Sequence, residues 1–414
     1  MHVLMVLWDG GGTVPVEVGA ARRLIEAGHS VTVLGEPSVG GAAAAVGARF
    51  RPWQRAPYPV QERIADWEVT NPLTLLRRLL DGLFTGPSAA LAADVRAAAE
   101  AEPVDAVVAD VALMGALVAA ESLGIPSAAL IPGPYLRPTP GEPPFGSGLS
   151  PATGPLGQLR DQVLPRVANR LTDLGLRQLN ATRHELGLEA LDHVWSQLDR
   201  TDRVLVLTAE AFDFPAGDRP ANVRYVGPIL DDPEWAGDAV PLPPGDDPLV
   251  LVGLSTARTR GAPELLERVV AGLAGCQVRA LVTTGPALRP VAAPRPGIQL
   301  VPSVPHSRVL PHVSLVVTHG GHGTVIKALA ADRPVLVLPL GRDQPDNAAR
   351  VVRHHAGARL RPTATPERIG RAVSELLTDP SYAEGAARLG RLIRAAGVGD
   401  RFVAEVTGMV TGAR

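Results

Sequence analysis

The chain has 414 residues, of which 46% are hydrophobic and 20% are charged. It is too long for one ordinary core and too apolar to be disordered, and it fits two domains of roughly 200 residues each. Its formal net charge of −2, with no stripe of Lys and Arg interleaved with aromatic residues, excludes an electrostatic footprint for nucleic acid. The single cysteine, Cys276, excludes an internal disulfide and a cysteine-cluster metal site, and we expect it to be a small core residue.

The amino-terminal segment reads MHVLMVLWDGGG and predicts a buried strand followed by a glycine turn. Its apolar run is too short to span a membrane and lacks a basic leader, and glycines follow it rather than a small-residue cleavage site. We therefore expect a cytoplasmic protein without a membrane span.

In the first half of the chain, short apolar strands alternate with helices, which is typical of a doubly wound parallel sheet in an α/β protein. Strands are expected at residues 3–7, 31–34, 106–108, 128–131, 204–207 and 223–226, and helices at residues 16–27, 72–83 and 113–123.

Residues 231–247, DDPEWAGDAVPLPPGDD, are rich in Pro, Gly and Asp without hydrophobic periodicity, so they predict an interdomain linker. Strands are expected again at residues 249–254, 280–283, 299–301, 315–317 and 335–338. The sequence thus predicts two Rossmann-like domains that face each other across a cleft. They comprise residues 1–230 and 248–398, and residues 399–414 form a terminal segment with a helix near 401–410.

A glycine turn follows the buried strand near 315–318. Gly320, Gly321 and Gly323 have no Cβ, so their amides can approach an anion closely. A helix expected from about residue 324 to 331 points its positive end at the same place, and His319 and Thr324 add side-chain donors. This pattern predicts a phosphate site.

The next strand, 334–338, ends shortly before Asp343 and Gln344. A carboxylate beside an amide suits the vicinal hydroxyls of a sugar. A phosphate site and a polyol site are therefore expected one βαβ crossover apart.

These motifs, HGGxGT, ALxxxxP and DQxxNAxR over residues 319–350, are similar to the donor-binding signature of family 1 glycosyltransferases. Those are inverting nucleotide-sugar enzymes of GT-B fold. The resemblance implies a UDP- or dTDP-sugar donor and no cofactor. It also implies a leaving diphosphate stabilised by His319, the glycine amides and Thr324 without a metal, and a final helix that crosses back onto the first domain.

The spacing of His306, His312 and His322 fits no metal site.

Other donor contacts are expected at the carboxyl ends of neighbouring strands. By the resemblance, Ser255 and Thr256 would touch the diphosphate or sugar, Thr284 would lie beside them, and the backbone around Ser303 and Val304 would meet the nucleobase. Many relatives carry an aromatic residue at the position of Ser303, so the identity of the base stays open.

The resemblance also implies a His that acts as general base in the glycine loop after the first strand. Counted from the Gly28–His29 pair that ends the first helix, that position is Thr13, which cannot serve as a base near neutral pH. Asp110, where relatives place the Asp that orients the His, and Asp9 are the two candidate replacements. Asp9 also suits a turn, Asp110 a helix N-cap, and Thr13 a cap of the helix that starts near residue 14.

Aromatic residues are scarce, and several of them gather in the first domain. Core packing explains most of them, but an apolar acceptor site would draw on the same set. The Pro- and Gly-rich loop 131–157 is long enough to be a lid and is our candidate cover for the acceptor. The candidate acceptor-binding residues are Trp67, Phe84, Met114, Tyr135 and Phe145.

The favoured hypothesis is an enzyme that moves a sugar to a hydroxyl of a hydrophobic small molecule with inversion. The alternative is a non-catalytic GT-B protein that binds a nucleotide sugar, because the usual His is absent. A dinucleotide oxidoreductase is disfavoured, because DGGGTVP does not match GxGxxG and only Glu36 follows the second strand. The sequence leaves open whether the protein is a monomer or a homodimer.

Overall fold

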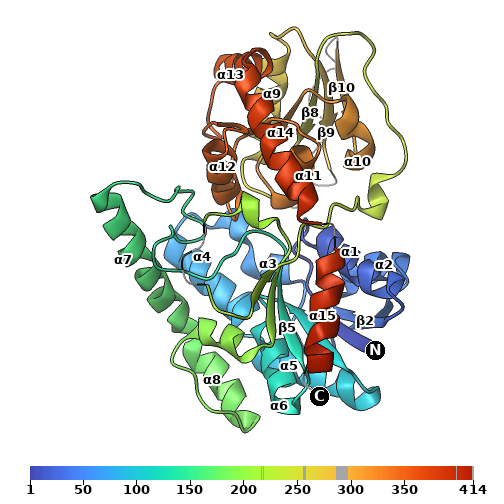
Figure 1. The fold of residues 1–414 in the computed structure, drawn as a ribbon, viewed down its shortest axis with the longest axis vertical. Helices are drawn as coiled ribbons and strands as arrows, with labels where there is room; N and C mark the ends of the chain where they lie inside the picture. The colour runs from blue at the N-terminus through green and yellow to red at the C-terminus, as the bar shows by residue number, and fades with distance from the viewer. Residues whose placement is uncertain (216, 218, 255–257, 286–296, 398, 413–414) are drawn as a thin grey trace.

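The computed structural model describes residues 1–414 except 216, 218, 255–257, 286–296, 398 and 413–414. Two sheets form two stacked domains (Figure 1), and every strand pair described is parallel. The first sheet has the order β3-β2-β1-β4-β5-β6-β7 and the second β10-β9-β8-β11-β12-β13. The expected pair of doubly wound α/β sheets is therefore confirmed.

The strands of the first sheet are β1 (His2–Leu7), β2 (Ser30–Gly35), β3 (Arg49–Pro52), β4 (Ala106–Asp110), β5 (Ser127–Ile131), β6 (Arg203–Val206) and β7 (Val223–Tyr225). Those of the second are β8 (Leu249–Gly253), β9 (Arg279–Thr283), β10 (Ile298–Val301), β11 (Leu315–Thr318), β12 (Val335–Val337) and β13 (Gly357–Arg359).

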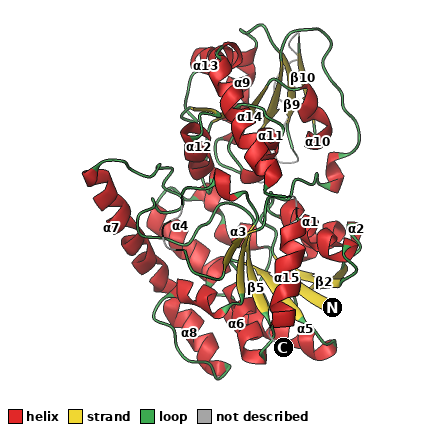
Figure 2. Ribbon diagram, in the orientation of Figure 1, coloured by secondary structure: helices red, strands yellow, loops and turns green. Residues whose placement is uncertain are grey.

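Helices cover both faces of each sheet (Figure 2). Those of the first domain are α1 (Val14–Glu26), α2 (Gly40–Ala45), α3 (Val60–Ile64), α4 (Pro72–Leu79), α5 (Ser88–Ala101), α6 (Met114–Leu123), α7 (Pro155–Thr172) and α8 (Leu176–Glu185). The second half contains α9 (Ala262–Leu273), α10 (His306–Val309), α11 (His322–Ala330), α12 (Gln344–Arg353), α13 (Pro366–Thr378), α14 (Pro380–Ala395) and α15 (Asp400–Gly412). No helix in the described part of the chain is long and apolar enough to cross a membrane.

Each strand expected from the sequence is present. Most of these strands are runs of buried Val, Leu, Ile and Ala, whereas β7 and most of β10 are half-buried. The short edge strands β3 and β13 were not predicted. The helix expected at 72–83 is instead α4 followed by a π-helical turn, Leu80–Phe84, and the helix expected from residue 324 begins at His322.

The last helix lies against the first domain although the chain reaches it from the second (Figure 1). Phe402, Val406 and Met409 of α15 are buried in the same apolar cluster as Val3 and Met5 of β1. Arg203 at the start of β6 donates to Glu405 at 2.7 Å. Burying these side chains ties the end of the chain to the first sheet.

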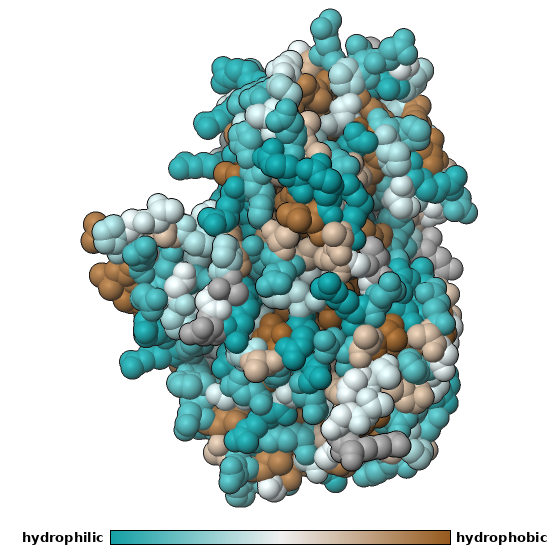
Figure 3. All heavy atoms as spheres, viewed as in Figure 1, coloured by the Kyte–Doolittle hydropathy of each residue, from teal (hydrophilic) through white to brown (hydrophobic). Residues whose placement is uncertain are grey.

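One helix of the first domain stands apart from the rest. Helix α7 projects outward at the edge of the molecule (Figure 1), and apolar atoms show at its outer end (Figure 3). The side chains of Leu156, Leu159, Val163 and Val167 are exposed, and their spacing puts them on one helical face.

The carboxyl ends of the two sheets meet between the domains. A Cβ at Gly133, just after β5, would lie 3.7 Å from the ring of His322, the first residue of α11. Arg342 of the second domain makes a bidentate ion pair with Asp66 of the first. The loops that follow these strands therefore lie together between the two domains.

A buried ion pair reinforces this contact. Arg350 of α12 donates to Asp213, which precedes β7 in the first domain, and both side chains are almost fully buried. Burial by itself would raise the pKa of Asp213, but Arg350 and Arg219 lower it below its usual value. The pair is thus ionised and joins the domains.

The long loop between β5 and α7 docks on the second domain. The Asp346 carboxylate on α12 accepts hydrogen bonds from the amides of Gly146 and Gly148, and Arg359 donates to the Gly148 carbonyl at 2.8 Å. The loop expected to cover the acceptor is therefore held by the helix that begins at Gln344.

We predict that Asp346→Ala releases this loop. The change removes a charged acceptor from two amides, so hydrogen exchange in a peptide covering residues 139–150 should accelerate by about tenfold or more. Arg353→Ala, an exposed change on the same helix, is the matched control and should leave the exchange unaltered. Equal protection in both variants would show that Asp346 does not hold the loop.

Candidate active site

The turn between β11 and α11 requires glycine. Gly320 has φ +101°, and a Cβ there would lie 2.6 Å from Val337 Cγ1 and 3.1 Å from the Gln344 carbonyl. Gly321 is the N-cap of α11, and no side chain caps the helix. The first-turn amides are thus available to an anion, at the positive end of the helix.

His319 packs over this turn. A Cβ at Gly321 would lie 2.9 Å from His319 Nε2, and His319 Nδ1 lies 3.3 Å from Thr318 Oγ1. Burial lowers the pKa of His319 to about 4, with Arg342 acting in the same direction and the Gly253 backbone opposing. The ring is therefore neutral at pH 7 and can donate one N–H to a phosphate oxygen beside the helix start.

Asp343 is tied to the glycine turn through Asn347. The Asn347 amide nitrogen donates to the Asp343 carboxylate at 2.7 Å and to the Gly320 carbonyl at 2.8 Å. Burial raises the pKa of Asp343, while hydrogen bonds from Asn347 and from the His322 amide oppose the rise. Asn347 is part of the sequence motif, but the structure is needed to show that it links the acid to the turn.

Gln344 is buried, and its side-chain oxygen accepts hydrogen bonds from the loop that precedes it. Oε1 accepts from the amides of Leu340 at 2.7 Å and Gly341 at 3.1 Å. The amide nitrogen is the part of Gln344 left to donate to a ligand.

The remaining donor-site candidates are less closely grouped. Ser255 and Thr256 lie outside the described residues. Thr284 bonds the Val301 carbonyl through its backbone amide, the Ser303 hydroxyl donates to the Trp235 carbonyl at 3.2 Å, and Val304 is buried in the core. Within the described residues, no group of three or more His, Cys, Asp or Glu side chains could hold a metal ion. The roles of Thr284, Ser303 and Val304 in donor binding stay predictions.

Asp110 lies at the carboxyl end of β4 and is 3% exposed. Its Oδ1 accepts the Ala112 amide at 2.7 Å in a local turn, and α6 starts only at Met114, so Asp110 is not the helix N-cap. Glu17 of α1, 0% exposed, lies beside it. Burial raises the pKa of Asp110, while the hydrogen bond from the Ala112 amide and the nearby Glu17 carboxyl and Trp8 indole act against that rise.

Sequence reasoning did not single out Glu17. It stands one helical turn after Thr13, so the two residues share a face of α1. The spacing of four residues from Thr13 is the sequence signal that could have identified Glu17 as a neighbour of the site.

The two other catalytic candidates play local roles. Thr13 is at the N-cap position of α1, where its carbonyl accepts the amides of Val16 and Glu17, but its buried hydroxyl makes no capping hydrogen bond. Asp9 accepts the Gly11 amide at 3.0 Å, which is the turn role weighed for it above.

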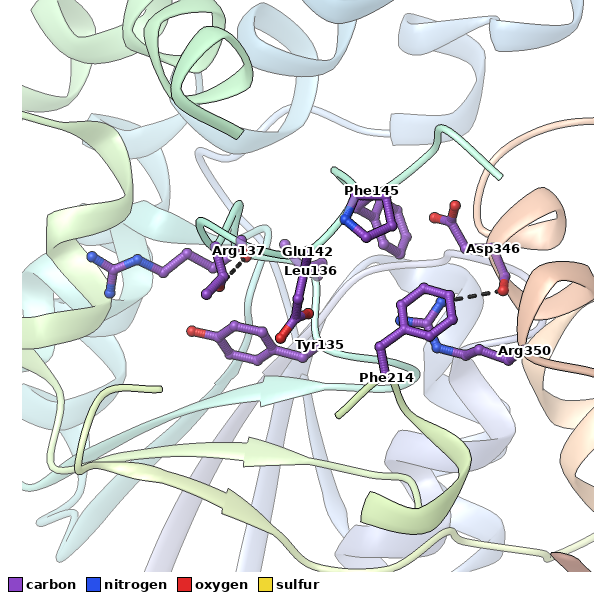
Figure 4. Close-up of a pocket in the computed structure, with 10 residues that line it drawn as sticks. Tyr135, Leu136, Arg137, Glu142, Phe145, Phe214, Asp346 and Arg350 are labelled. Carbon is purple, nitrogen blue, oxygen red and sulfur yellow. Dashed lines mark hydrogen bonds between the residues drawn. The ribbon is translucent and has the colours of Figure 1, made fainter. Parts of the chain in front are cut away.

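Two of the acceptor-site candidates line one pocket between the loop and α12 (Figure 4). Tyr135 and Phe145 lie there with Phe214, whose ring stacks 4.0 Å from the Arg350 guanidinium. Asp346 closes the pocket on the side of the second domain.

The other three candidates lie elsewhere. Trp67 packs 5.0 Å from the Arg258 guanidinium of the second domain, at the cleft. Phe84 makes an edge contact with Trp195, and Met114 is fully buried, so these two have packing partners in the core of the first domain.

Residues 272–405 match the family model described as "Erythromycin biosynthesis protein CIII-like, C-terminal domain". The chain is 31% identical over 403 residues to 4'-demethylrebeccamycin synthase of Lentzea aerocolonigenes, covering 94% of each chain. Among solved structures, the kitacinnamycin glycotransferase superposes with a TM-score of 0.77 at 25% identity, covering 99% of this chain and 98% of that one. VinC, a glycosyltransferase solved in complex with DTDP, covers 100% of both chains with a TM-score of 0.70 at 21% identity.

The similarities to 4'-demethylrebeccamycin synthase and to the solved glycosyltransferases extend over nearly the whole chain. The same family is indicated by the glycine turn before α11 and by the pair of parallel sheets. The chain belongs to the family 1 glycosyltransferases of GT-B fold, among relatives that act on natural products.

Proposed function

We propose that the protein transfers a sugar from a UDP- or dTDP-sugar to a hydroxyl of a hydrophobic small molecule, with inversion at the anomeric carbon. One observation carries the proposal: the uncapped start of α11, with Asp343 linked to its glycine turn, faces the first domain at Gly133. Gly133 follows β5, and β5 pairs with β4, the strand that ends in Asp110. An in-line displacement at the anomeric carbon needs the nucleotide-sugar on one side and a base for the acceptor hydroxyl on the other. The second and first domains would supply these two sides.

The donor diphosphate would lie on the first-turn amides of α11, with the neutral His319 and Thr324 as further donors. These groups would stabilise the leaving diphosphate without a metal. Asp343 and Gln344 would meet the sugar hydroxyls. VinC, a glycosyltransferase of the same fold, was solved in complex with DTDP, which supports a nucleoside diphosphate as the part of the donor that this protein binds. We also propose that the enzyme works in the cytoplasm and needs no cofactor.

In the reaction, the acceptor oxygen would attack the anomeric carbon from the face opposite the diphosphate. The bond from that carbon to the phosphate oxygen breaks with its electrons going to the diphosphate, and the acceptor proton passes to Asp110 directly or through water. Because a carboxylate is a weak base for an aliphatic alcohol, phenols and similarly acidic hydroxyls should react best.

We predict that His319→Ala lowers kcat by about 10²-fold or more at saturating donor, because a donor to the leaving diphosphate is lost. The half-buried ring contacts mainly its own turn, so thermal stability should change little. Nucleotide release coupled to product formation measures the rate, with the exposed His312→Ala as control. Unchanged turnover in a folded variant would remove His319 from the donor site.

We predict that Asp110→Asn lowers kcat by about 10²-fold or more and leaves donor affinity nearly unchanged. Asn keeps the size and an acceptor for the Ala112 amide, so the fold should persist. Because burial raises the pKa of Asp110, the wild-type rate should rise with pH as this acid ionises, and the variant should lose that rise.

Asp9→Asn is the matched control for this experiment. A loss in Asp9→Asn with full activity in Asp110→Asn would assign the base to Asp9. A protein that binds the nucleotide sugar but transfers nothing to any acceptor would favour the non-catalytic alternative, which the Thr at position 13 supports.

A further inference from the structure

We propose that Glu17 is a positioning residue for Asp110: its protonated carboxyl donates a hydrogen bond to the Asp110 carboxylate and keeps that carboxylate ionised and oriented as the base. The inference rests on the proposed function, because it gives Asp110 a task in transfer. It concerns a residue that no motif of the sequence singles out.

The geometry brings the two acids together. β4 pairs with β1 in the centre of the sheet, and α1 follows β1, so the end of β4 lies beside the first turn of α1. Glu17 is 0% exposed and Asp110 3% exposed. In the described structure neither Glu17 carboxyl oxygen has a hydrogen-bond partner, so the bond to Asp110 is what the proposal adds.

Two ionised carboxylates cannot share such a site at low cost, because no described Lys, Arg or His side chain forms an ion pair with either acid. Among the described residues, Asp110 is the charged group whose proximity raises the pKa of Glu17. The basic residues of the same helix, Arg22 and Arg23, are directed to Asp231 and Glu26. The Glu36 carboxylate, at the end of β2, accepts the backbone amide of Asp9 at 2.8 Å. One of the two acids must therefore hold a proton.

The hydrogen bonds decide which acid holds it. Asp110 already accepts the Ala112 amide, and the nearby Trp8 indole also favours its ionised form. Glu17 has no comparable donor, so burial, with the Asp110 charge second, raises its pKa well above the usual value. The proton thus resides on Glu17, and its O–H is the donor that Asp110 gains.

During transfer, Asp110 would take the acceptor proton while Glu17 keeps its own. The pair then carries two protons, and one returns to solvent after the product leaves. If Glu17 ionised, the pair would hold two adjacent negative charges and the Asp110 side chain would be repelled from its place.

A first test follows stability against pH and needs no substrate. A buried acid whose pKa is raised on folding stabilises the protein fully below the unfolded pKa of about 4.3, and this stability is lost as the pH rises through the folded pKa. Gln cannot ionise, so the Tm of Glu17→Gln minus that of wild type should grow as the pH rises above that value. Glu26→Gln, an exposed change on the same helix, should give a constant difference. A constant difference for Glu17→Gln as well would mean that Glu17 is not held protonated.

A second test uses the rate of transfer to a phenolic acceptor. Glu17→Gln keeps a hydrogen-bond donor for Asp110, whereas Glu17→Met has similar length and none. We expect Glu17→Gln to retain kcat within about threefold of wild type. Glu17→Met should lose about tenfold or more, with the acid limb of its pH–rate profile moved to higher pH and donor KM unchanged.

The outcomes separate this inference from the proposed function. Equal rates and pH profiles in Glu17→Gln and Glu17→Met would overturn the role of Glu17 while leaving the transferase intact. Rate losses that simply follow Tm in both variants would reduce Glu17 to a structural residue and overturn the inference too. A wild-type protein that transfers no sugar would remove the proposed function and this inference with it.

Discussion

The close approach of Gly320 to Val337 and to the Gln344 carbonyl is the constraint on which the donor side of the cleft depends. No side chain fits there, so β11 can turn directly into α11 with its first amides exposed to a ligand. Asn347 binds the Gly320 carbonyl and the Asp343 carboxylate together, so the same turn also places the start of α12. The proposed phosphate and sugar sites are thereby fixed relative to each other by two hydrogen bonds from one amide group.

The same helix α12 connects the donor side to the first domain. It holds the buried Arg350–Asp213 ion pair and the amides of the loop between β5 and α7. Removing one partner of such a buried pair leaves an uncompensated charge, so the domains are joined by an interaction that is costly to break. In the first domain, the acids Glu17 and Asp110 form no ion pair with a described residue, and the proton that we propose on Glu17 takes the place of a cation.

The parallel sheets and the glycine turn before α11 were predictable from the sequence, because most buried strands are continuous apolar runs and the glycines have a specific spacing. The edge strands β3 and β13 were missed because Arg49, Arg51 and Gly357 break that apolar signal. Glu17 was missed because Glu is seldom fully buried, and only the pairing of β4 with β1 brings Asp110 to it. Composition could not separate Phe84 and Met114, which pack in the core, from Tyr135 and Phe145, which line a pocket, because all four are ordinary apolar residues in sequence.

The most direct test of the central claim is a crystal structure of the protein with dTDP or UDP. We expect phosphate oxygens within hydrogen-bond distance of the backbone amides at the start of α11 and of His319, with Asp343 beside the position of the sugar. A nucleotide bound away from α11, or no binding at millimolar concentration, would contradict it.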